Sequence, residues 1–183
     1  RIWPAGTGPR MGAYFLLLGL AFLFIEMAFI QKFILFLSHP LYSVAVVLSG
    51  FLVFAGLGSV LSERLAGKLE GNDCSPVAIA VGGIALFAIV YVILLPLVFQ
   101  RCIGFSDPVK IVISVVLIAP LAISMGMPFP LGLRYVAATA PNFIPWAWGI
   151  NGFASVISAV LATLLAIEFG FVFVILVALV LYA

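Results

Sequence analysis

Charged side chains are scarce in this chain of 183 residues, where they make up 8% of the sequence against 66% for hydrophobic residues. Soluble domains carry about a quarter charged residues and about half apolar ones. The scarcity of charge therefore argues against a soluble domain and indicates a polytopic membrane protein, with one transmembrane domain over residues 1–183. The basic residues are scattered and the net charge is only +2, so we expect no nucleic-acid partner.

Side chains that build metal and catalytic sites are equally few. The chain has one histidine, His39, and two cysteines, with no carboxylate cluster beside them from which a metal site could be made. No nucleophile is paired with a base, and no strand leads into a glycine-rich turn that could hold a nucleotide. We therefore expect no catalytic residue, no cofactor and no metal ion in this chain.

What the sequence does contain is a series of long apolar runs separated by short connections. A membrane-spanning helix needs about 20 such residues. The predicted spans are 12–37, 41–61, 76–99, 109–125 and 145–168, followed by a shorter apolar run at 171–183. Residues 1–11 are expected to form an N-terminal loop. The fold prediction is an all-α bundle of about six transmembrane helices, the sixth incomplete, and we expect the chain to be a fragment of a longer protein.

The connections predict how these spans are arranged. Because the connections are short, consecutive spans are expected to be antiparallel neighbours. Alternating spans place five basic residues on the side of the N-terminus and three on the other side, which favours a cytoplasmic N-terminus. The first group is Arg1, Arg10, Arg64, Lys68 and Arg134, and the second is Lys32, Arg101 and Lys110.

Glu26 is an ionisable residue in the middle of the first apolar run. A charge in the hydrocarbon costs about 2.5 to 3.5 kcal/mol on insertion scales, so this side chain is expected to face another helix. It shares a heptad stripe with Gly12 and Gly19, and small residues on such a stripe allow close helix approach. Two interpretations remain open, a proton or cation site and a hydrogen-bonded or neutral packing residue. Gln31 is a further candidate for a hydrogen bond to a neighbouring helix.

The stretch SMGMPFPLGLRY interrupts the helical pattern after the fourth span. Pro128 and Pro130 remove two backbone donors, so carbonyl groups at membrane depth are left without helical partners. Such breaks line ion or substrate sites in transporters, but they also simply end helices. Arg134 follows on a short amphipathic segment, LGLRYVAATA, that is expected to lie along the membrane interface.

The fifth span is predicted to pack closely against other helices. Its small residues form a stripe suited to close contact, and Asn151 is expected to hydrogen-bond to a partner helix. The stripe consists of Gly152, Ser155, Ala159, Ala162 and Ala166.

Four stretches together carry a family resemblance: FIEMAFIQKFILFLSHP, GLGSVLSERLAG, MGMPFPLGLRY and PWAWGINGFASVISAVLAT. In this order they resemble the membrane region of bacterial spermidine synthase-like proteins, which fuse major facilitator helices to a soluble domain similar to aminopropyltransferases. The second stretch also resembles the loop between the second and third helices of major facilitator transporters, through Gly58, Glu63, Arg64 and Gly67. The resemblance implies a bundle like half of a major facilitator transporter, located in the bacterial inner membrane.

The functional expectation combines the residues with this resemblance. We expect a non-catalytic membrane module, an anchor or accessory subunit, whose partners are membrane lipids and either other membrane subunits or the rest of its own polypeptide. Any aminopropyltransferase-like activity would lie in a domain absent from this chain. The alternative is half of a secondary transporter for a small molecule or polyamine, with Glu26 as its proton or cation site.

Overall fold

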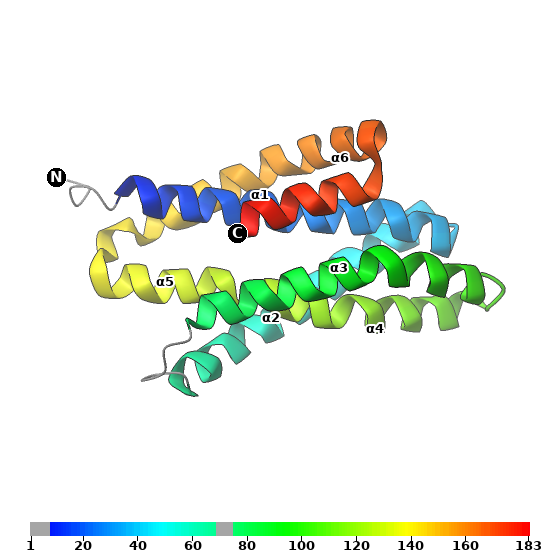
Figure 1. Cartoon of the computed structure of the whole chain (residues 1–183), viewed down its shortest axis with the longest axis horizontal. Coiled ribbons are helices and arrows are strands. Elements are labelled where there is room, and N and C mark those ends of the chain that lie inside the picture. The colour runs from blue at the N-terminus through cyan, green and yellow to red at the C-terminus, as the bar shows by residue number, and fades with distance from the viewer. Residues whose placement is uncertain (1–7, 69–74) are drawn as a thin grey trace.

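The computed structural model describes residues 8–68 and 75–183, and in these residues it contains helices and no strand (Figure 1). The elements are α1 Gly8–Leu37, α2 Pro40–Lys68, α3 Pro76–Cys102, α4 Asp107–Met125, α5 Pro128–Thr139, the 3-10 helix η1 Pro141–Phe143, and α6 Ile144–Tyr182. The predicted all-α class is therefore confirmed.

Five helical segments of the described residues are long and apolar enough to cross a membrane, with α4 and α5 together forming one of them. They mark the chain as an integral membrane protein. The predicted sixth apolar run is a second helical piece within α6, residues 171–182. They follow a break at Gly170, whose φ of 82° and ψ of 173° are not helical. The ribbon reverses direction at this glycine and returns alongside α1 (Figure 1).

Two helices extend beyond the predicted spans. Helix α1 begins at Gly8, so residues 8–11, assigned above to the N-terminal loop, are helical, whereas residues 1–7 lie outside the described residues. Helix α2 continues to Lys68 through the stretch that resembles a transporter loop. Ser, Glu, Arg and Lys do not break a helix, so the decline in hydropathy after Leu61 marks where α2 becomes polar and not where it ends.

The predicted neighbour relations were only partly correct. The most extensive helix pair is α1 with α6, which are far apart in the sequence, and the next is α2 with α4, whereas the consecutive helices α2 and α3 have little contact. A short connection fixes where the next helix starts, but in lipid the fit of side chains decides which helices stay together.

Helix α1 is the most buried of the spanning helices, and its phenylalanine rings pack against neighbouring helices. The ring of Phe29 contacts Phe51 of α2 at 5.6 Å, Tyr91 of α3 at 6.0 Å and Phe171 of α6 at 5.9 Å between centroids. Edge-to-face and offset aromatic pairs of this kind add about 0.5 to 1.5 kcal/mol each beyond the area they bury. One side chain of α1 thus joins three other helices.

Two glycines make the crossing of α2 and α4 possible. A Cβ atom at Gly58 of α2 would collide with the carbonyl oxygen of Ile123, and one at Gly126 would collide with the carbonyl oxygen of Ala55. The two backbones therefore touch directly on both sides of the crossing. Gly56, in contrast, has open space beside it.

Candidate functional site

Glu26 lies on the side of α1 that faces α6. Gly12 and Gly19, two heptads and one heptad before it, point at α6: a Cβ at Gly12 would lie 3.6 Å from Ile150, and one at Gly19 would lie 2.5 Å from the carbonyl oxygen of Asn151. Glu26 is 4% exposed, as expected for a residue covered by protein. Within residues 8–68 and 75–183 its carboxyl group has no hydrogen bond or ion pair, which leaves both interpretations of this residue open.

Gln31 and Asn151 do not join Glu26 in one site. Gln31 is half-buried and has no side-chain hydrogen bond to any described residue. Asn151 donates from Nδ2 to the carbonyl oxygen of Phe15 at 3.1 Å. Because Phe15 is eleven positions before Glu26 on the same helix, the amide lies about 16 Å from it along the axis.

The hydrogen bond expected from Asn151 to another helix is therefore present, and a second one lies beside it. Ser158 of α6 donates to the carbonyl oxygen of Leu20 at 2.6 Å. The small residues that α6 buries before its break at Gly170 are Ala147, Ala154, Ser158 and Ala162. This set shares only Ala162 with the predicted stripe, so the prediction selected a neighbouring face of the helix.

The break between α4 and α5 is held by a residue that the sequence analysis did not single out. The hydroxyl group of Tyr14 on α1 donates to the carbonyl oxygen of Pro128 at 2.7 Å. The ring of Tyr14 also covers Gly132, where a Cβ atom would collide with it. The carbonyl group of the first residue of α5 thus accepts a hydrogen bond from a neighbouring helix. The sequence contains one signal for this contact, a tyrosine within an apolar run, because a buried hydroxyl group needs a hydrogen-bond partner.

Helix α5 is not a detached amphipathic segment. It buries Leu131, Gly132 and Val136 and packs against α1, α2 and α3. Its polar side carries Arg134, which shares the lining of a cavity of about 520 Å³ with Glu63 and Ser62 of α2. Pro130 also lines this cavity.

A second cavity, of about 440 Å³, lies between α1, α2, the α4–α5 break and α6. Its polar side chains include Ser59, Asn151 and Ser155, and Pro130 lines it as well. Among the described residues no charged side chain lines it, and Glu26 is not part of its wall. The structure thus brings Asn151 and Pro130 to one cavity, whereas Glu26, Gln31 and Pro128 are not part of its lining.

Metal chemistry has no evident location in the described ranges. No group of three or more histidine, cysteine, aspartate or glutamate side chains occurs among residues 8–68 and 75–183. Comparisons of the chain with family models, curated proteins and solved structures found no match.

Proposed function

We propose that this chain is a non-catalytic membrane module, an anchor or accessory subunit of a larger assembly in the bacterial inner membrane. We also propose that it is related to the membrane part of spermidine synthase-like proteins, on the four sequence stretches given above. The observation that carries the role is the unequal covering of the helices. Helix α1 has the largest buried share of the spanning helices, whereas α2, α3 and α6 keep most of their apolar side chains uncovered.

One face of α6 suits a partner helix especially well. Gly149 and Gly152 have open space beside them, and Phe153 and Val156 on the same side of the helix are 63% and 71% exposed. Glycines on an outward face let a second backbone approach closely, and close packing is the main source of association between helices in lipid. This face, residues 149, 152, 153 and 156, is the outer face of α6.

The cavity of about 440 Å³ favours a second candidate function, half of a secondary transporter. It lies at a helix break and has hydrogen-bonding side chains, which is where transporters place their substrate sites. Its lining lacks charge among the described residues, so it suits a neutral solute better than a polyamine cation. Glu26 does not line this cavity, although Phe22 and Leu23, about one helical turn before it on α1, do.

Photo-crosslinking in the native membrane tests the proposed role. A benzophenone side chain at position 153, on the outer face of α6, is expected to capture another membrane protein or, in a longer polypeptide, a distant segment of it. The same group at position 129, which packs inside the bundle, serves as the matched control and should yield no intermolecular product. A monodisperse 19.5 kDa protein in mild detergent, with no partner captured at position 153, would contradict the proposal.

The transporter alternative has a separate readout. Uptake of a solute into proteoliposomes, driven by a proton gradient and lost in the Asn151→Ala variant, would favour it over the anchor. Absence of uptake together with a captured partner would favour the anchor.

A further inference from the structure

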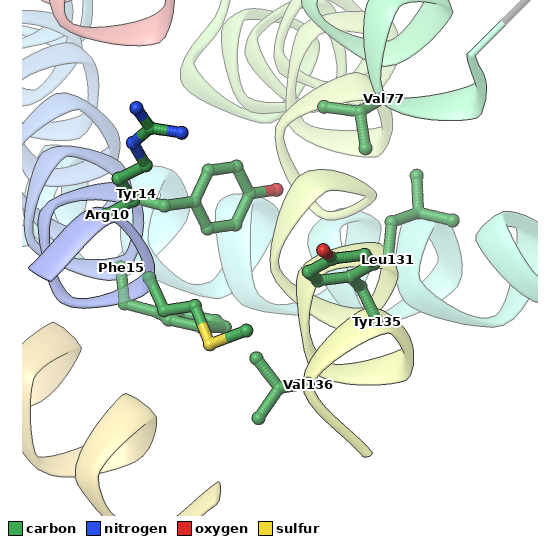
Figure 2. Close-up of a pocket in the computed structure, with 9 residues that line it drawn as sticks. Arg10, Tyr14, Phe15, Val77, Leu131, Tyr135 and Val136 are labelled. Atoms are coloured by element: carbon green, nitrogen blue, oxygen red, sulfur yellow. The ribbon is translucent and has the colours of Figure 1, made fainter. Parts of the chain in front are cut away.

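A cavity of about 310 Å³ lies at the end of the bundle where α1 and α3 begin (Figure 2). Helix α1 contributes Arg10, Met11, Tyr14 and Phe15, helix α3 contributes Val77, and helix α5 contributes Leu131, Gly132, Tyr135 and Val136. Its volume is at the lower end of the range of small-ligand pockets, about 300 to 1,000 Å³. None of the residues discussed under the proposed function lines it.

The lining of this cavity is hydrocarbon apart from one charge and two hydroxyl groups. Tyr14 already donates its hydroxyl hydrogen to Pro128, and Met11, Phe15 and Val136 are buried side chains of one apolar cluster. Within the part of the chain that the structure describes, Arg10 is the one charged group in the lining. Figure 2 shows its guanidinium group at the edge of the cavity, beside Tyr14.

The position of the cavity matches the boundary between hydrocarbon and headgroups. Arg10 is in the first turn of α1 and Val77 is in the first turn of α3, so the opening is at the end of both helices. The same end of the bundle carries Arg64 and Lys68 on the last turns of α2, as Figure 1 shows from the placement of these helices. Basic residues at such ends meet anionic headgroups.

We propose that this cavity binds one anionic phospholipid, with its phosphate group on Arg10 and part of one acyl chain against Met11, Phe15 and Val136. An acyl chain leaves one hydrocarbon environment for another when it enters the cavity, so the chain by itself gives little preference. Arg10 hydrogen-bonds the phosphate of any phospholipid, but the bond favours an anionic lipid, whose headgroup brings no cation beside the phosphate to oppose the guanidinium charge. The cavity holds the acyl chain of one lipid molecule next to Arg10.

Native mass spectrometry of the purified full chain tests this site, with phosphatidylglycerol and phosphatidylcholine of the same acyl chains as probes. We expect the parent protein to retain phosphatidylglycerol more strongly. The Arg10→Gln variant should reduce that preference by at least about tenfold, the factor expected for losing a hydrogen bond to a charged group. The matched control is Arg64→Gln, which removes a charge from the same end of the bundle but not from the cavity, and its preference should stay near that of the parent.

A second variant tests the acyl-chain part of the site. Val77→Trp, or Val77→Phe if the larger residue disturbs folding by circular dichroism, fills the cavity from α3 and should reduce retention of phosphatidylglycerol while leaving Arg10 in place. Equal retention of both lipids by the parent would overturn the proposal. An equal loss in the Arg10 and Arg64 variants would also overturn it, because it would show a general attraction of the basic end and not a site.

Discussion

Glu26 is the residue whose surroundings bear most directly on function. It is buried on the α6 side of α1 and has no polar partner among the described residues. A carboxyl group in such a place is tolerated in the membrane most easily when it is neutral. A neutral carboxyl group and a carboxamide have nearly the same shape and both hydrogen-bond.

We therefore expect Glu26→Gln to preserve the fold. The free energy of unfolding, measured by SDS titration of the helical circular dichroism signal, should change by less than about 1.5 kcal/mol, as for other volume-conserving core substitutions. Glu168→Gln on the exposed part of α6 is the control and should have no effect. Unfolding of the Glu26 variant would show that the carboxyl group itself is required. Loss of proton-coupled uptake with an intact fold would support the transporter.

Tyr14 is the residue that links α1 to the start of α5 by a hydrogen bond. Tyr14→Phe keeps the ring against Gly132 but removes the hydrogen bond to Pro128. Hydrogen bonds between membrane helices contribute about 0.6 kcal/mol on average and at most about 1.7 kcal/mol, so we expect a loss of stability in that range by SDS titration. Tyr135→Phe, on the exposed side of α5, removes a hydroxyl group without this contact. Equal stability of the two variants would contradict the assigned role.

At the scale of the helices, the crossing of α2 and α4 depends on glycine at position 58 but not at position 56. Gly58→Ala places a methyl group against the carbonyl oxygen of Ile123, whereas Gly56→Ala points into open space. Overpacking costs about 1 to 3 kcal/mol, so Gly58→Ala should destabilise by that amount. Gly56→Ala should leave stability unchanged or raise it by up to about 1 kcal/mol through its higher helix propensity. Denaturation of both variants in the same micelles compares them, and a larger loss at Gly56 would refute this packing.

The whole molecule has an orientation that its charges predict. In the structure Arg10, Arg64 and Lys68 lie where α1 begins and α2 ends, whereas Arg101 lies at the end of α3. With the first group cytoplasmic, the connection after α3 faces the periplasm.

Cysteine labelling measures this orientation. In a background with Cys74→Ser and Cys102→Ser, a membrane-impermeant maleimide should label Gly104→Cys in intact spheroplasts and Lys68→Cys only after the membrane is opened. Both positions are exposed, so the membrane alone separates them. The reverse pattern would place the N-terminus outside.

Much of the fold follows from the sequence alone. Apolar runs of spanning length must become helices in lipid, because every backbone donor and acceptor has to be satisfied within the segment. The predicted spans 12–37, 76–99 and 109–125 accordingly lie inside α1, α3 and α4. Burial of Glu26 was predictable for a similar reason, since the energetic cost of its carboxyl group in hydrocarbon does not depend on which helix covers it.

The partners of each helix and the shape of the cavities were decided only by tertiary structure. The lipid around a helix is as apolar as the neighbouring helices, so hydrophobicity does not show which face of the helix makes contacts. Steric fit at single glycines and hydrogen bonds from single hydroxyl groups decide the contacting face. Gly56 and Gly58 lie two residues apart in the same apolar run, so the sequence does not distinguish them. Of these two, only Gly58 lies against another backbone. Tyr14 became the partner of Pro128 because α1 passes the break between α4 and α5, a proximity that no spacing along the chain encodes.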